Sequence, residues 1–216
     1  MHSAPKDDLQ HYLQQGREAV LWKLDGLGER DVRRPLTPTG TNLLGLVKHL
    51  AGVESDYFGE VWGRPFPEPL EWVGDAEPNA DMWATANESR EEMVELYIRV
   101  GAHSDATITD LPLNATAEVP WWRPESRTVT LHRLLVHVAT ETHRHAGHAD
   151  LVRELIDGQA RPTDSSVQPA RPRPHLVGRL SRPPPVGRRR RRVSMGSRIP
   201  VTNKLSDHHH APEDGP

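Results

Sequence analysis

Apolar side chains recur every three to four residues in four stretches of the 216-residue chain, which is the spacing of one buried helix face. The first stretch covers about residues 6–26 and ends at Gly26 and Gly28. The other three run from Thr41 to the segment GRPFPEP, from Asp81 or Thr85 to about residue 110, and from Thr128 or Thr130 to Asp157 and Gly158. The pattern therefore predicts four amphipathic helices.

The segments between these helices are rich in proline and glycine, which interrupt helices. RRPLTPTG follows the first helix, residues 63–80 form a long connection after the second, and LPLNATAEVPWWRPESRT before the fourth is predicted to be extended or irregular. No run between them alternates apolar and polar residues as a half-buried strand would. We therefore predict an all-α fold, a four-helix bundle with long connections.

The composition changes near residue 160. Residues 161–216 contain twelve Lys and Arg against four Asp and Glu, a charge of +8, and ten of the twenty prolines but no Phe, Trp or Tyr. The totals for the chain leave fifteen bases and 26 acids in residues 1–160, a charge of −11. Since the second part has too few apolar residues to offset the entropy of ordering, we predict one domain, residues 1–160, and a disordered Arg/Pro-rich tail, residues 161–216.

The absence of cysteine excludes a disulfide framework, a thiolate metal ligand and a cysteine nucleophile. The first residues, MHSAPKDDLQ, lack the basic start and apolar core of a signal peptide, and no apolar run approaches the ~18 residues of a membrane span. We expect a cytoplasmic protein with no membrane partner. Any thiol chemistry would have to use a thiol from another molecule.

Histidines are concentrated in the fourth predicted helix, in the segment LLVHVATETHRHAGHADLVREL. A helical projection places His145 within the apolar stripe, Glu141 at its margin, and His137 and His148 further round the same edge, whereas His143 points to solvent. A carboxylate and an imidazole four residues apart project side by side, so one metal ion can bridge them. The alternative is that His145 is a hydrogen-bonded core histidine and Glu141 a half-exposed helix residue.

The second predicted helix also places an acid toward the core. Counted from Leu43, Glu54 lies near the centre of the apolar face and His49 at its edge. Glu54 could orient a metal ligand, carry a proton or compete as a ligand. The alternative for Glu54 is a salt bridge with an arginine that faces the core.

The segments TNLLGLVKHLAGVESDYFGEVWG and WWRPESRTVTLHRLLVHVATETHRHAGHADLVRELIDG resemble the DinB-like metal-binding four-helix-bundle superfamily, in particular an actinobacterial branch. The similarity extends over about residues 5–160. It implies a divalent ion, zinc or nickel, held by His49, Glu141 and His145. The carboxylate at position 141 is similar to the mycothiol-dependent maleylpyruvate isomerase branch, whereas several other relatives have histidine there.

The resemblance also implies a class of reaction. Three protein ligands leave coordination positions open, as in catalytic zinc sites, and relatives use mycothiol or bacillithiol as a small-molecule thiol. We expect a transferase or isomerase in which a metal-activated thiolate attacks an electrophilic substrate. The alternative is a metal-binding, stress-associated protein without turnover.

Two further segments are candidates for binding. Trp121, Trp122 and Arg123 stand on a proline-bounded loop, where they could line the mouth of a pocket and receive a substrate carboxylate, or else close the end of the bundle. The segment GRRRRRVSMGSR could contact nucleic acid, but without interleaved aromatic residues it is more typical of a solvated tail. The sequence does not define the oligomeric state, for which a homodimer is one option.

Overall fold

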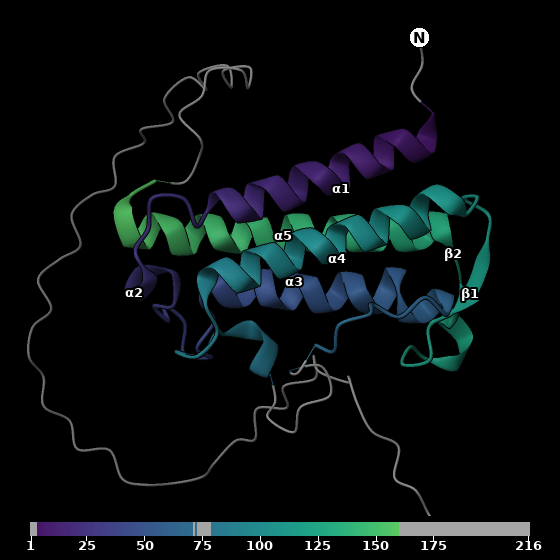
Figure 1. The fold of residues 1–216 in the computed structure, drawn as a ribbon. Helices are drawn as coiled ribbons and strands as arrows, with labels where there is room; N and C mark the ends of the chain where they lie inside the picture. Colours follow the sequence, from purple (N-terminus) through teal and green to yellow (C-terminus); the bar gives the residue numbers. More distant parts are fainter. Residues whose placement is uncertain (1–3, 71, 73–78, 160–216) are drawn as a thin grey trace, which may run out of the picture. The chain divides into compact units, whose positions relative to one another are not determined.

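The computed structural model describes residues 4–70, 72 and 79–159, and most of these residues are helical (Figure 1). The long helices are α1 (Pro5–Trp22), α3 (Leu43–Phe58), α4 (Arg90–Asp110) and α5 (Leu131–Asp157). The short elements are helix α2 (Glu29–Val32), the 3-10 turns η1 (Glu60–Trp62), η2 (Ala80–Met82) and η3 (Pro124–Ser126), and the strands β1 (Thr116–Glu118) and β2 (Thr128–Thr130). The predicted tail, residues 161–216, and its arginine run lie outside the described residues.

Polar side chains define where the long helices begin. The side chain of Asn42, not of Thr41, accepts a hydrogen bond from the backbone N–H of Gly45 at 2.7 Å and so starts α3. Ser89 caps α4 in the same way, so the predicted start of that helix near residue 81 is wrong. Thr130 caps α5 as expected, and Gly158 ends it with a φ of 79°.

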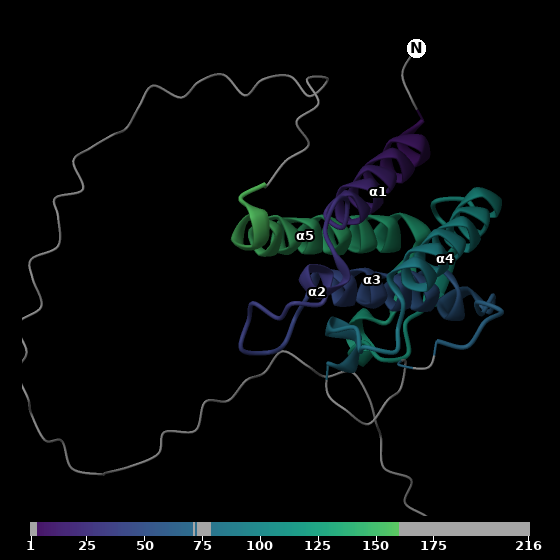
Figure 2. The ribbon, with the colours of Figure 1, turned by 60° about the vertical axis from the view of Figure 1, so that its left-hand side comes forward.

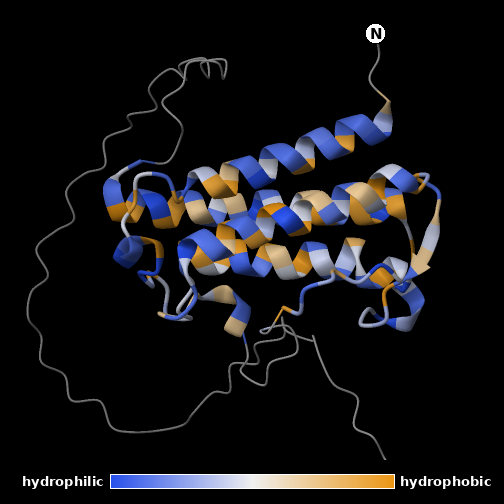
Figure 3. Ribbon diagram, viewed as in Figure 1, coloured by the Kyte–Doolittle hydropathy of each residue, from blue (hydrophilic) through white to orange (hydrophobic). Residues whose placement is uncertain are grey.

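The four long helices pack through apolar faces. Helix α1 lies along α5, and α3 lies along both α4 and α5 (Figures 1 and 2). Helix α3 is buried along most of its length, and it is visibly more hydrophobic than α1 (Figure 3). Leu13, Leu50, Tyr97 and Leu135 each come from a different helix and are at most 1% exposed. No helix of the described residues is long and apolar enough to cross a membrane.

One antiparallel pair of strands precedes α5. Strands β1 and β2 pair with Ala117 opposite Val129, so the prediction of an all-α fold is wrong in this detail. Each strand has only three residues, which is too short to produce a readable alternation of apolar and polar positions. Because Thr130 is both the end of β2 and the cap of α5, this hairpin fixes where the helix begins.

A close approach of backbones holds the turn η2 against α3. A Cβ atom added at Gly45 would lie 2.1 Å from the carbonyl oxygen of Met82, so only glycine allows this contact. The backbone N–H of Asn42 donates to the same carbonyl at 3.3 Å. Residue 49 lies one helical turn after position 45 on α3. The contact at Gly45 therefore places residue 81 of η2 beside residue 49.

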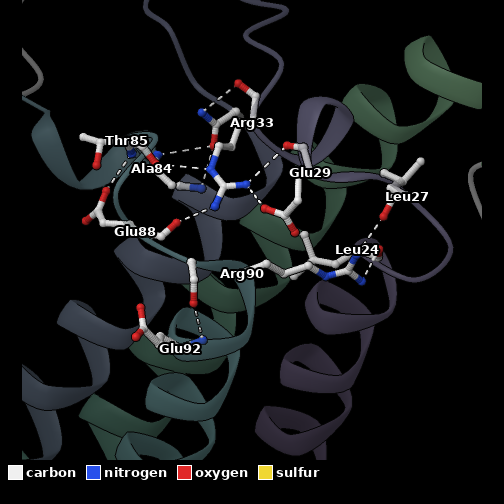
Figure 4. A network of polar contacts seen from close by, with 12 residues as sticks. Leu24, Leu27, Glu29, Arg33, Ala84, Thr85, Glu88, Arg90 and Glu92 are labelled. Carbon is white, nitrogen blue, oxygen red and sulfur yellow. Dashed lines mark hydrogen bonds and ion pairs between the residues drawn. The ribbon is translucent and has the colours of Figure 1, made fainter.

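Two arginines tie the connection between α1 and α3 to the start of α4 (Figure 4). Arg33 donates to the carbonyl oxygens of Thr85, at 3.2 Å, and of Glu88. Arg90 donates to the carbonyl oxygens of Leu24 and Leu27, at 2.5 and 2.7 Å. The acceptors are backbone oxygens of turns and loops, which lie outside the regular hydrogen bonding of a helix or a sheet.

Candidate metal centre

Helices α3 and α5 bring His49, Glu141 and His145 together. Each residue offers one ligand atom, and these atoms all lie within 4.8 Å of one another. A carboxylate oxygen of Glu141, Oε1, lies 2.9 Å from Nε2 of His145 and 3.9 Å from Nε2 of His49. Ligand atoms about 2.0–2.2 Å from one zinc ion would be separated by similar distances, so the donor set fits a divalent ion.

The orientation of His49 is fixed by a residue that the sequence analysis considered only as a helix cap. Nδ1 of His49 lies 2.5 Å from Oδ2 of Asp81, in the turn η2. Its Nε2 is buried and has no hydrogen-bond partner among the described residues. A carboxylate behind a histidine commonly orients a metal ligand and increases its basicity. The ring therefore presents a solvent-shielded nitrogen toward Glu141.

The two oxygens of Glu141 have different partners. Oε1 faces the imidazoles of His145 and His49, whereas Oε2 is paired with the guanidinium of Arg144. Burial opposes ionisation of this carboxyl, but the hydrogen bonds from His145 and Arg144, together with the attraction of the nearby His49, hold the pKa of Glu141 well below its usual range. Glu141 is thus a carboxylate with one oxygen directed at the cluster.

The pKa values of the two imidazoles are shifted in opposite directions. Burial disfavours the charged form of His49, but the hydrogen bond with Asp81 and the attraction of the Glu141 carboxylate outweigh it and raise the pKa of His49 to about 9. Burial and the nearby charge of His49 lower the pKa of His145. His49 lies between the carboxylates of Asp81 and Glu141. This is a position where a divalent cation would bind favourably.

His137 and His148, which the helical projection places on the same edge of α5 and makes candidates for the surroundings of the site, occupy separate positions. His148 is exposed, and its Nδ1 lies 3.3 Å from Nδ1 of His145. His137 is half-buried between the rings of Tyr57 and Trp122, with centroids at 4.9 and 5.1 Å. His148 therefore contacts the candidate ligand His145, whereas His137 belongs to an aromatic cluster.

Glu54 is fully buried and forms the salt bridge that was considered as its alternative role. Its two carboxylate oxygens accept hydrogen bonds from Arg17 of α1, at 2.8 and 2.6 Å. Arg17 also contacts Asp105 of α4 at 3.0 Å. Arg17, Glu54 and Asp105 together link three helices and lie outside the group of His49, Glu141 and His145.

A groove runs from the cluster along the exposed side of α5. It has a volume of about 490 Å³ and is lined by Trp122, Arg133, Val136, His137, Thr140, Glu141 and Arg144. The indole N–H groups of Trp121 and Trp122 point to the Tyr57 hydroxyl, at 3.4 and 2.9 Å. Arg123 is exposed and is not among the lining residues, whereas Arg133 is. Arg133 is not among the residues predicted from the sequence, where its one signal is its helical spacing to Glu141.

Comparisons with known proteins identify a matching family and a similar fold. Residues 8–158 match the family model described as mycothiol-S-transferase. Among solved structures, the chain is similar to a conserved protein from Enterococcus faecalis, with a TM-score of 0.57 and 14% identity, over 73% of this chain and 100% of that chain. At this identity the likeness shows the fold alone. No curated protein matches the chain.

Proposed function

The chain belongs to the mycothiol-S-transferase family, and on that premise we propose that it is a metal-dependent transferase that joins mycothiol to an electrophilic small molecule. The observation that carries this proposal is the convergence of two imidazoles and one carboxylate from α3 and α5, with an unpartnered buried nitrogen on His49. We also propose that the four long helices form a four-helix bundle. Their packing of α1 on α5 and of α3 on α4 and α5 supports that arrangement.

The donor set suits a borderline divalent cation such as zinc or nickel, which imidazole and carboxylate ligands bind well. When bound, such an ion supplies Lewis acidity, which lowers the pKa of a coordinated thiol whose free value is about 8.5. His49, Glu141 and His145 would hold the ion and leave positions open for other molecules. Asp81 would orient His49, and Arg144 would hold the second oxygen of Glu141.

The sulfur must come from the small-molecule thiol, because the chain has no cysteine. In the proposed transfer the thiol gives its proton to solvent, and its sulfur forms a bond with an electrophilic carbon. The leaving group departs from that carbon with the electron pair of the bond that breaks. An isomerase would use the same attack followed by release of the sulfur, and a non-catalytic metal protein would use neither step.

The proposal is tested with full-length protein purified without an affinity tag. Elemental analysis is expected to give one divalent ion per chain, and mass spectrometry is expected to detect S-conjugates of mycothiol with a chloromethyl electrophile. Removal of the ion by a chelator should stop conjugation, and its return should restore it. A stoichiometric ion without conjugation of mycothiol, bacillithiol or glutathione would instead support the non-catalytic alternative.

A further inference from the structure

The groove along α5 shares one residue with the candidate metal centre. Its lining residues on this helix recur every three to four positions between Arg133 and Arg144, so they form one stripe. Trp122, from the loop before β2, lines the groove beside Arg133, near the start of α5 and remote from the cluster. Because Glu141 belongs both to the groove and to the cluster, a molecule in the groove can reach the ligand residues.

The charge of the groove differs from that of the domain around it. Residues 1–160 carry a net charge of −11, yet the groove contains two arginines and only one acid, Glu141. That acid already faces two imidazoles and Arg144. Arg133 also lies in the first turn of the 27-residue helix α5, where the helix dipole is positive. A positive groove on an acidic molecule favours anionic ligands.

The remote end of the groove is preorganised for a flat anion. The guanidinium of Arg133 lies 5.0 Å from the ring centre of Trp122, and its Nη1 donates to the carbonyl of Ser126 at 3.3 Å. The indole of Trp122 is held by its 2.9 Å hydrogen bond to Tyr57. A guanidinium fork can bind both oxygens of a carboxylate, and an indole face offers an apolar wall to a planar group.

The length of the groove limits which molecules can use both ends. Arg133 and Glu141 are eight positions apart on α5, which corresponds to about 12 Å along the helix axis. A small, compact acid bound at Arg133 would not reach the cluster. A molecule with its carboxylate at one end and its reacting carbon at the other would reach it.

We propose that this groove binds the electrophilic substrate, and that the substrate is an elongated, planar carboxylate recognised by Arg133 and Trp122. This inference rests on the proposed transferase function, since it places the reacting carbon beside His49, Glu141 and His145. Arg133 takes the role of carboxylate receptor that the sequence suggested for Arg123. The two arginines stand ten residues apart on either side of β2, so the structure offers a matched pair for a test.

The test uses full-length protein labelled with ¹⁵N at tryptophan and followed by NMR at the indole N–H of Trp122. The probes are 4-methylbenzoate and its neutral analogue 4-methylbenzamide, which have the same shape. In the unaltered protein the carboxylate is expected to shift the Trp122 signal at lower concentration than the amide. Arg133→Gln should weaken the carboxylate about tenfold or more, Arg133→Lys should weaken it less, and Arg123→Gln should leave it unchanged.

Equal binding of acid and amide, or equal binding by the unaltered protein and Arg133→Gln, would overturn the inference. The metal content of Arg133→Gln is measured in parallel and is expected to be normal, because Arg133 is not in the ligand group. If no variant binds an ion but the carboxylate still depends on Arg133, the proposed function fails and the groove assignment stands as a binding site. With mycothiol, KM for the elongated acid 4′-(chloromethyl)biphenyl-4-carboxylate should rise in Arg133→Gln, and an unchanged KM would overturn the assignment of the groove as the substrate site.

Discussion

At the scale of single residues, the candidate centre is defined by what each polar atom contacts. Nε2 of His49 is buried without a hydrogen-bond partner among the described residues, and leaving a buried polar atom unpaired costs about 1–3 kcal/mol. Coordination of an ion would remove this cost. His143, only two residues from His145, instead directs its Nε2 to the carbonyl oxygen of Tyr12 at 2.9 Å and is exposed. Neighbouring histidines of one helix therefore have different expected roles.

The first prediction uses this difference. Glu141→Ala and His145→Ala should each abolish tight binding of a divalent ion, because each removes one of three ligands. His143→Ala should bind one ion per chain, since its side chain points away from the cluster. Metal content after dialysis, measured by elemental analysis, gives the answer. Equal losses in all three variants would show that a different helix face holds the ion.

The second prediction concerns Asp81. Its carboxylate does not belong to the ligand group but holds Nδ1 of His49. Asp81→Ala should therefore retain the ion with an affinity about 10–100-fold lower, as is usual when such a supporting carboxylate is lost. Competition titration with a chromophoric chelator measures this affinity. An unchanged affinity would mean that Asp81 has no part in orienting His49.

The third prediction is a pH dependence of stability from Asp56 on α3. Burial, with a smaller contribution from the negative charge of Glu60, raises the pKa of Asp56 from 3.8 to about 6. The folded state therefore holds a proton that the unfolded state has lost between these values, so the contribution of Asp56 to stability falls as the pH rises through about 6. Asp56→Asn should have a higher Tm than the unaltered protein at pH 7.5, and the gain should shrink toward pH 4.5. A gain independent of pH would contradict this assignment.

At the scale of secondary-structure elements, two contacts decide how the helices meet around the centre. Gly45 lets the backbone of η2 lie against α3, which brings Asp81 to His49. The buried pair of Arg17 and Glu54 joins α1 to α3, and Asp105 extends it to α4. A buried pair contributes little net stability but makes each partner dependent on the other.

The fourth prediction follows from that dependence. Arg17→Met should destabilise the fold by about 3–5 kcal/mol, because it leaves the carboxylate of Glu54 buried without its partner. The double variant Arg17→Met, Glu54→Leu should recover much of this loss. Urea denaturation measures the free energy of unfolding, and Arg99→Gln, an exposed arginine of α4, serves as the control. A double variant that is as unstable as the sum of its two single variants would argue against coupling.

At the scale of the whole molecule, the chain divides by composition into an acidic part and a basic part. The family match covers residues 8–158, and both the groove and the proposed metal ligands His49, Glu141 and His145 lie within it. The second part contains the histidine run His208, His209 and His210, a potential weak metal ligand outside the described residues. Measurements of metal stoichiometry on the full chain have to distinguish an ion bound by this histidine run from an ion bound by His49, Glu141 and His145.

The fifth prediction makes that separation. Replacing His208, His209 and His210 together by alanine should leave one tightly bound ion per chain, because His49, Glu141 and His145 supply the ligands. Elemental analysis after extensive dialysis, at neutral pH, compares this variant with the unaltered protein. Loss of the tight ion from the triple variant would place the site in the second part of the chain.

The sequence by itself determined the helices and the residues that they turn inward. Hydrophobic spacing located the four long helices. The apolar stripe of α5 placed His145 in the interior and Glu141 at its margin, because burial of such a stripe fixes the rotation of a helix. Two helices are capped by other residues than predicted, by Asn42 and by Ser89. The exact start of a helix depends on local cap geometry, and several neighbouring polar residues could supply it.

Only the tertiary structure decided which inward residues meet. Asp81 stands behind His49 because η2 approaches Gly45, Glu54 pairs with Arg17 because α1 lies across α3, and Arg133 rather than Arg123 lines the groove because Thr130 fixes the start of α5. A periodic pattern specifies which face of an element is buried, but it carries no information on the partner across the interface. That partner is selected by the packing of the elements against one another.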